Sequence, residues 1–418
     1  MQKFEENIQR YADLAIKIGV NIQPGQRLLI RGPLLYGAPI STAPLVNALV
    51  KSAYQAGARR VDVLWGDESN ELARFQYAPR DSFAEMAAWK AGAAFEHVSH
   101  GDAVIGITGI NPDLLSSQDP DLVTAYTQAI QKALAPFQNL TSTNQVQWLV
   151  LPAPTPGWAQ KVFPHTPVEA AMDKMWQAMF AFSRLDRPDP VAAWREHTNN
   201  LKTRAAYLNS KQYASFHYRG PGTDLTIGFT GTAVWTGASE DSAAGIEFIA
   251  NMPTEEVFAA PHRLKAEGHI HATLPLNYSG TLIDDFDLRF EQGRVVHAAA
   301  KVGEAVLRKL LETDDGAGRL GEVALVPHSS PISQSGTLFY NTLLDENASC
   351  HLAVGRAYQT TLQGGGSWSD AEFNAQGGNT SLVHVDFMVG SGQLDIDGIL
   401  PDGRVEPVFR AGEWAFKA

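Results

Sequence analysis

Residues 27–65 read RLLIRGPLLYGAPISTAPLVNALVKSAYQAGARRVDVLW. The run Arg27-Leu28-Leu29-Ile30 is short and apolar, as is typical of a buried strand. Residues 43–56 have a helical pattern that Gly57 closes, and residues 60–65 form a second strand-like run. A strand, a helix and a second strand in this order form a βαβ unit. This stretch therefore predicts a parallel sheet covered by helices.

The same alternation continues on both sides of this stretch. Apolar residues recur at steps of four and three from Phe4 to Ile18, which predicts an amphipathic helix. Further along, the pattern predicts strands over 103–107 and 146–151 and helices over 82–94, 122–134 and 172–185. We therefore predict an α/β domain with a parallel-rich sheet over residues 1–185. No strand in it precedes a GxGxxG fingerprint, so this layout by itself does not indicate nucleotide binding.

The pattern changes beyond the proline-rich stretch Asp186-Arg187-Pro188-Asp189-Pro190, which is the expected domain boundary. After a predicted helix over 191–207, short alternating runs punctuated by glycine predominate. Later runs predict a β-hairpin over 284–290 and 295–299 and a helix over 300–311. We therefore predict an α+β domain with mixed or antiparallel strands over residues 191–418.

Composition limits the possible partners of the chain. It has 418 residues, a formal net charge of −12 and 44% hydrophobic residues, enough for a sizeable core. It lacks the stripe of Lys and Arg that neutralises phosphates, which argues against nucleic acid as a partner. An acidic surface disfavours anionic membranes, and no apolar run approaches the ~18 residues of a membrane span. A single cysteine, Cys350, and an N-terminus unlike a signal peptide indicate a cytoplasmic protein.

Two acidic segments in the second half suggest chemistry. Glu255 and Glu256 follow Thr254; the alternative interpretation is a helix N-terminus with Thr254 as its cap. Glu322 begins the apolar run 320–326, where a buried carboxylate is unfavourable unless it is paired or binds a metal. A strand-end acid that reaches water would explain the same pattern.

A third segment combines acids with a histidine. Asp345, Glu346 and His351 fall within seven residues, and carboxylates beside an imidazole suit Zn²⁺, Co²⁺ or Mn²⁺. Cys350 adjoins His351, but neighbours in sequence point in different directions, so we interpret the cysteine as a buried small residue. Tyr358 would share a face with His351 only if the segment were helical. A lone tyrosine is more often part of a core.

His384 and Asp386 lie two apart in a strand-like run and therefore project from the same face. This spacing suits two metal ligands, although a structural ion pair would have the same pattern. His269 and His271 are spaced alike, and we interpret them as part of a structural strand. Together the segments supply four acids and two histidines, about the number of protein ligands that two divalent ions need.

The residues from Asn251 to Trp414 resemble the aminopeptidase T/aminopeptidase S family of thermophilic-type metallopeptidases, family M29. The resemblance rests on five strings: NMPTEEVF (251–258), LGEVAL (320–325), SPIS (330–333), FYNTLLDENASCHLA (339–353) and HVDFM (384–388). The string containing His351 is the most specific of them. The N-terminal part fits through its length and its opening helix, so the resemblance covers essentially the whole chain.

This resemblance implies a metal-dependent aminopeptidase that releases N-terminal residues from peptides. It implies an active-site tyrosine at Tyr358, and the implied metal ligands are Glu256, Glu322, Glu346, His351, His384 and Asp386. It also implies two divalent metal ions (Zn²⁺, Co²⁺ or Mg²⁺) and a homodimer whose active site faces an internal cavity. In a two-metal mechanism we expect Glu322 to bridge the ions, and Glu255 or a ligand carboxylate to move the proton.

Two alternative functions remain open at this point. Another dinuclear metallohydrolase, such as a phosphoesterase, would use similar ligands but would need Arg or Lys to hold phosphate. Arg356 is the basic residue that lies within the ligand-bearing segments. A metal-binding or peptide-binding protein without catalysis would need ligands that coordinate the metal fully, with no open position for substrate.

Overall fold

The computed structural model describes residues 2–32, 37–278 and 281–417. By its contacts the chain divides into two compact units, Met1–Glu196 with Ser239–Pro253 and His197–Ala238 with Thr254–Ala418. The excursion Ser239–Pro253 belongs to the first unit because Asn251 forms a parallel bridge with Val150. The division into domains at 1–185 and 191–418 stays a prediction from the sequence. That prediction contains no counterpart of the segment Ser239–Pro253.

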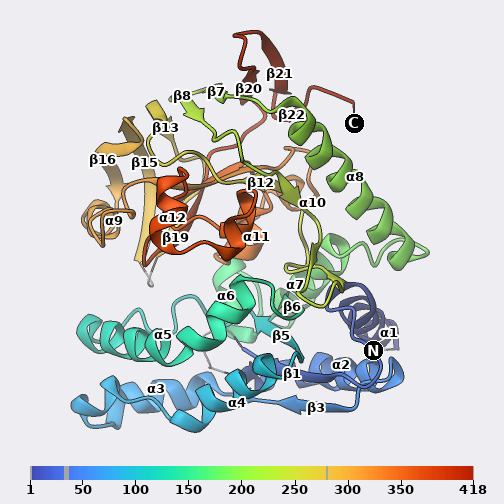
Figure 1. The fold of residues 1–418 in the computed structure, drawn as a ribbon. Coiled ribbons are helices and arrows are strands. Elements are labelled where there is room, and N and C mark those ends of the chain that lie inside the picture. The colour runs from blue at the N-terminus through green and yellow to red at the C-terminus, as the bar shows by residue number, and fades with distance from the viewer. Residues whose placement is uncertain (1, 33–36, 279–280, 418) are drawn as a thin grey trace. The chain divides into compact units, whose positions relative to one another are not determined.

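The first unit contains a parallel sheet, as predicted, with the strand order β3-β1-β5-β6 (blue to teal in Figure 1). Its strands are β1 (Arg27–Arg31), β3 (Arg60–Val63), β5 (Ala103–Thr108) and β6 (Trp148–Pro152). The shorter strands β2 (Ala38–Pro39) and β4 (Trp65–Gly66) pair beside it. Its helices are α1 (Gln2–Leu14), α2 (Ala43–Gln55), α3 (Glu68–Tyr77), α4 (Ala88–Ser99), α5 (Pro120–Ser142), α6 (Pro156–Val162) and α7 (Val168–Phe182).

One part of this unit differs from the sequence prediction. The helix expected over 82–94 is wrong, because residues 80–84 form a 3-10 turn and the helix begins at Ala88. Helix α3 was not predicted. It begins where the carboxylate of Asp67 accepts hydrogen bonds from the N–H groups of Ser69 and Asn70, a cap that satisfies otherwise unpaired donors.

The second unit is built from two antiparallel sheets, in agreement with the predicted α+β class. The smaller sheet has the order β19-β18-β17-β12-β9, with β9 (Thr236–Gly237), β12 (Val257–Ala259), β17 (Leu320–Leu325), β18 (His351–Gly355) and β19 (His384–Met388). The larger sheet contains β7 (Ser215–Gly220), β8 (Thr223–Gly228), β13 (Ala266–His271), β14 (Leu276–Tyr278), β15 (Thr281–Glu291), β16 (Arg294–Val302), β20 (Asp395–Ile399), β21 (Val405–Arg410) and β22 (Glu413–Trp414).

The second half of the chain also contains helices, of which α8 precedes these strands in sequence and the others lie between them. They are α8 (Pro190–Lys211), α9 (Glu304–Leu311), α10 (Pro331–Gln334), α11 (Thr342–Glu346) and α12 (Asp370–Ala375). The predicted hairpin is confirmed as β15 and β16. The helix predicted from residue 300 starts later, because residues 300–302 extend β16 and Gly303, with φ of +77°, breaks the strand. No helix among the described residues is long and apolar enough to cross a membrane.

The smaller sheet has one apolar face and one polar face. Val323, Leu352 and Phe387 belong to the core cluster shared with the larger sheet, and Phe387 contacts Phe286 of β15 with ring centroids 5.8 Å apart. Because side chains alternate along a strand, the residues between them project from the opposite face. Glu322, His351 and Asp386 are therefore presented on that second face, although all three are buried.

Candidate metal centre

Three neighbouring strands bring the candidate ligands together. In β17, β18 and β19, Glu322 is paired with Ala353, and Ala353 is paired with Asp386. His384 begins β19 opposite Gly355. Strand register thus sets the spacing of side chains that are far apart in the sequence.

Two groups of metal-ligating atoms result, and Glu322 belongs to both. His351 Nε2 lies 3.2 Å from Glu256 Oε2 and 3.6 Å from Glu322 Oε1. His384 Nε2 lies 3.6 Å from Glu322 Oε2 and 3.3 Å from Asp386 Oδ1. Within each group the potential ligand atoms all lie within 4.8 Å of one another. Glu322 therefore presents one carboxylate oxygen to each group.

Glu256 reaches the cluster from the segment before β12. The alternative interpretation of this segment, a helix N-terminus capped by Thr254, is wrong, because the chain enters a strand at Val257. Val257 and Ala259 pack in the core cluster, so Glu256 and Phe258 face the other side of the sheet. The Glu256 carboxylate is buried there beside His351.

The electrostatics of the cluster are dominated by buried negative charge. Burial raises the pKa of Glu346 well above its usual value, and the charges of Asp386 and Glu256 raise it further. Burial by itself would lower the pKa of His351, but hydrogen bonds to Glu256 and Glu322 raise it well above its usual value. The imidazole proton supplies positive charge here, a role that a divalent cation can take over.

The donor set fits a divalent metal ion. The Nδ1 atoms of both histidines face backbone carbonyl oxygens, of Ser349 at 3.1 Å for His351 and of Arg356 at 2.6 Å for His384. A carbonyl can only accept, so each Nδ1 carries the proton and each Nε2 is left to face the carboxylates. Asp386 Oδ1 is buried and, apart from its 3.3 Å contact with His384 Nε2, has no hydrogen-bond partner among the described residues. Carboxylate oxygens with neutral imidazole nitrogens are the ligands that Zn²⁺ and Co²⁺ accept.

Glu346, the last residue of α11, stands apart from the two groups. In the part of the chain that the structure describes, its carboxylate belongs to neither of them. It is nevertheless close enough to Asp386 and Glu256 for their charges to raise its pKa. Glu346 therefore lies beside the cluster of ligand atoms and not within it.

Tyr358 lies at the edge of the same cluster. Its ring centroid is 5.1 Å from that of His384 and 6.1 Å from that of Phe258. The side chain is 37% exposed, so it contacts both the cluster and the surroundings from which a substrate would approach. His351 and Tyr358 share no helix, because His351 begins β18 and Tyr358 follows its end.

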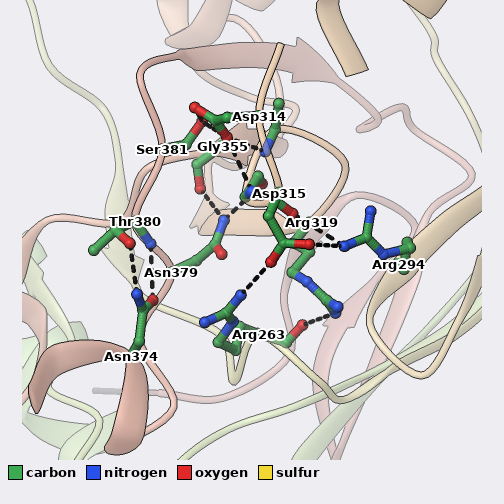
Figure 2. Close-up of polar contacts among 12 residues, drawn as sticks. Arg263, Arg294, Asp314, Asp315, Arg319, Gly355, Asn374, Asn379, Thr380 and Ser381 are labelled. Carbon is green, nitrogen blue, oxygen red and sulfur yellow. Dashed lines mark hydrogen bonds and ion pairs between the residues drawn. The ribbon is translucent and has the colours of Figure 1, made fainter. Parts of the chain in front are cut away.

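A hydrogen-bond network that the sequence did not reveal holds the segment between β18 and Tyr358 (Figure 2). Asn379 is fully buried and donates from Nδ2 to the carbonyl oxygens of Gly355 (2.6 Å) and Gly316 (2.8 Å). Its own backbone carbonyl accepts the N–H of Ala357 at 2.8 Å. Arg356, between these two anchored residues, supplies the carbonyl that faces His384 Nδ1. Asn379 therefore holds the peptide segment that precedes Tyr358 and orients His384.

The outer part of this network fixes the turn before β17. Asp314 accepts hydrogen bonds from the hydroxyl of Ser381 and the N–H of Leu382. Its neighbour Asp315 forms ion pairs with Arg263 and Arg294 (Figure 2). These contacts connect the turn to the segment that leads into β19.

A second buried asparagine connects two ligand-bearing segments. Asn347 Oδ1 accepts the N–H of Glu255 at 2.7 Å, and its Nδ2 donates to Leu343 of α11 at 2.8 Å. The carboxylate of Glu255 is buried and lies 3.5 Å from His197 Nε2. The segments that carry Glu256 and Glu346 are thus held to one another.

Three residues set aside in the sequence lie outside the cluster. Cys350 is buried, its thiol donates to the carbonyl of Val326, and burial raises its pKa to about 12, so it is a poor nucleophile. His271 pairs with Asp287 on the neighbouring strand β15, and His269 lies on the same strand β13.

Buried carboxylates and imidazoles that could hold metal ions, as in this cluster, are the kind of site that metal-dependent hydrolases use. The sequence matches the model of the thermophilic metalloprotease (M29) family over residues 4–414, and the chain belongs to this family. It is a metalloaminopeptidase, a hydrolase that requires a divalent metal.

Known relatives and a solved structure agree with this assignment. Aminopeptidase 2 of Geobacillus stearothermophilus is 46% identical over 417 residues, 100% of each chain. Aminopeptidase AmpS of Bacillus subtilis is 43% identical over 416 residues, again 100% of each. The structure of wild-type AmpT from Thermus thermophilus superimposes with a TM-score of 0.92 at 38% identity, over 99% of this chain and 100% of that one.

Proposed function

We propose that this aminopeptidase releases N-terminal residues from peptides at a centre that holds two divalent ions. The observation that carries the proposal is the position of Glu322, whose two carboxylate oxygens face different histidines. Glu256 and His351 would complete one ion's ligands, and His384 and Asp386 the other's. Glu346 would serve as a further metal-site carboxylate. We propose that the two ions of this centre are Zn²⁺, Co²⁺ or Mg²⁺.

Two such ions would supply an acidified water, a polarised carbonyl and a place for the substrate's free α-amine. The chain's own residues do the rest. Tyr358 would donate a hydrogen bond from its phenol to the oxyanion that forms when the peptide carbonyl is attacked. Because its ring packs between His384 and Phe258, the phenol is held beside the cluster.

A carboxylate is needed to move the proton from the attacking water to the leaving amine. Glu255 and the carboxylates of the cluster were both candidates. The Glu255 carboxylate lies 3.5 Å from His197 Nε2. Among the described residues, it belongs to neither group of ligand atoms. The contact with His197 favours a carboxylate at the cluster for the proton transfer, and we propose Glu346, which, in the part of the chain that the structure describes, also belongs to neither group of ligand atoms.

The experiment that tests the proposal is hydrolysis of a leucyl arylamide before and after removal of the metal with a chelator. We expect activity to disappear with the metal and to return when Zn²⁺, Co²⁺ or Mg²⁺ is added. An N-acetylated substrate should resist hydrolysis, because it lacks the free α-amine. Activity that survives complete metal removal would overturn the proposal, and equal cleavage of the acetylated substrate would overturn its exopeptidase part.

The phosphoesterase alternative has weaker support. Arg356, the basic residue of the ligand-bearing segments, donates from Nε to the carbonyl of Ser381 and lies 3.7 Å from Asp370. It is therefore engaged in holding the loop. A phosphomonoester screen would detect such an activity directly. The homodimer and the cytoplasmic location remain predictions from the sequence.

A further inference from the structure

Arg31 occupies a distinctive place in the first unit. It is the last residue of β1, an inner strand in the order β3-β1-β5-β6. The chain leaves β1 for β3 on one side and later enters β5 on the other. In open parallel sheets, ligands bind outside the carboxyl ends of the strands at such a change of direction. Arg31 lies at that end of the sheet.

The guanidinium of Arg31 is buried, and two of its three nitrogen atoms have no hydrogen-bond partner among the described residues. The residue is only 6% exposed. Its Nε and Nη2 atoms are inaccessible to solvent and form no hydrogen bond with any residue that the structure describes. These two N–H groups form one edge of the guanidinium, the edge that binds both oxygens of a carboxylate or phosphate. The guanidinium also forms a cation–π contact, with its central carbon 4.7 Å from the ring centroid of Phe137.

Arg27, at the opposite end of the same strand, shows the usual arrangement. Its Nε and Nη2 atoms both contact Asp102 Oδ2, at 2.7 Å and 2.5 Å. In Arg27, the Nε–Nη2 edge of the guanidinium thus binds the carboxylate of Asp102. In Arg31, the same edge has no hydrogen-bond partner among the described residues. The two arginines form a natural comparison within a single five-residue strand.

A buried cation without a counter-charge is unfavourable in a folded protein. Burial lowers the pKa of Arg31 to about 10, and no carboxylate opposes this effect. The group nevertheless stays charged at neutral pH. An anion that met the free edge would restore the missing hydrogen bonds and the missing charge together.

We propose that Arg31 binds an oxyanion, the carboxylate or phosphate group of a small molecule, at the carboxyl end of the sheet in the first unit. The residues of the metal cluster belong to the second unit. The inference therefore does not depend on the proposed peptidase mechanism.

The test compares thermal unfolding in sodium chloride, sodium phosphate and sodium acetate at equal ionic strength. Phosphate stabilises proteins in general by exclusion from their surface, so the informative quantity is the difference between variants. We expect the wild-type protein to gain a saturable rise in Tm, about 2–4 °C at ten times Kd. Arg31→Met should lack this rise, and in chloride it should melt higher than the wild type because it no longer buries an unpaired charge.

Arg27→Met is the matched control. It should melt lower than the wild type, because it leaves Asp102 without its partner, and it should keep the full response to the anion. Anions that bind at the metal cluster would affect all three proteins alike. A response to phosphate alone identifies a phosphate-bearing ligand, and a response to acetate alone identifies a carboxylate. An equal response of the wild type and Arg31→Met to both anions would overturn the proposal.

If Arg31→Met does not fold, two further measurements can test the proposal. Arg31→Lys keeps the positive charge but cannot bind an oxyanion in a bidentate way. We therefore expect it to lose the anion-dependent rise in Tm. Calorimetric titration of the wild-type protein with phosphate and with acetate should show saturable heat. The absence of such heat for both anions would overturn the proposal without any variant.

Discussion

The rings of Tyr358 and His384 lie 5.1 Å apart, inclined at 60°. The two residues come from different segments, one following β18 and the other beginning β19. This contact places Tyr358 beside His384, which belongs to one of the two groups of ligand atoms.

Tyr358→Phe removes the phenol and leaves the ring contact in place. We expect kcat to fall by roughly 10²–10³, because one hydrogen-bond donor to the oxyanion is lost. Metal content, measured by elemental analysis, should stay at the wild-type level. Tyr77→Phe, at a tyrosine that is 82% exposed, is the control and should keep full activity. Loss of metal from Tyr358→Phe would show that the tyrosine is itself a ligand.

Glu322→Gln changes the carboxylate shared by both ligand groups. We expect it to lose nearly all bound metal, because the amide keeps one oxygen and carries no charge. Glu256→Gln affects one group only, and it should retain about half of the metal. Elemental analysis after dialysis distinguishes the two, with Glu312→Gln on the surface as the control. Equal metal content in Glu322→Gln and the wild type would exclude Glu322 as a bridge.

Metal removal should also lower the stability of the protein. Each bound ion would stabilise the folded chain by about 2.7 kcal/mol when its free concentration is 100 times Kd. Calorimetric melting with and without chelator measures the effect as a fall in Tm. The melting of Glu322→Gln should hardly respond to chelator, since it has little metal to lose. An unchanged wild-type Tm after metal removal would contradict a buried metal centre.

Asn379→Ala removes the two hydrogen bonds that hold Gly355 and Gly316. We expect kcat to fall roughly 10–100-fold with little change in KM, because a small displacement of Tyr358 and His384 weakens catalysis more than binding. Asn374→Ala, in the neighbouring helix α12, is the matched control. It loses its contacts with Thr380 but touches neither Gly355 nor Ala357. If both variants lose kcat equally, Asn379 only stabilises the loop.

Asp314→Asn should reveal a pH-dependent contribution to stability. Burial alone would raise the pKa of Asp314, but hydrogen bonds from Leu382, Ser381, Ala317 and Gly316 outweigh it and lower the pKa below its usual 3.8. A lowered pKa in the folded state stabilises the protein above the unfolded pKa, and this contribution is lost as the pH falls through the folded pKa.

We therefore expect Asp314→Asn to be less stable than the wild type by about 1–3 kcal/mol at pH 6. The difference should shrink as the pH falls below ~4, because the carboxylate then takes up a proton in the unfolded chain before it does so in the folded one. Urea unfolding at several pH values measures it. A difference that stays constant from pH 6 to pH 3 would show that ionisation of Asp314 contributes nothing.

Much of the fold was predictable because its signals are local. Strands β1, β5 and β6 are short apolar runs, and α2 ends at Gln55, close to the Gly57 that was expected to close it. The errors lie where a few residues decide a boundary. Asp67 caps α3, and Gly303 separates β16 from α9. Neither signal stands out from the surrounding pattern before the cap or the turn is seen.

The site was predictable only in part from the spacing of residues. The two-residue spacing of His384 and Asp386 does place both on one face of β19. The spacing of Glu256, Glu322 and His351 is compatible with separate surface acids and a core histidine, and the family resemblance was needed to join them. Asn379 and Arg31 carried no signal at all, since an asparagine in a loop and an arginine after a strand are common.

The sequence by itself determined most of the strands and helices and the face of β19 that carries His384 and Asp386. These properties depend on neighbours within a few residues, through backbone geometry and the period of burial. The tertiary structure alone decided that Glu322 faces two histidines, that Asn379 holds the segment before Tyr358, and that Arg31 lacks the partner that Arg27 has. These relationships depend on strand register and on the burial of side chains far apart in the chain, which no local pattern encodes.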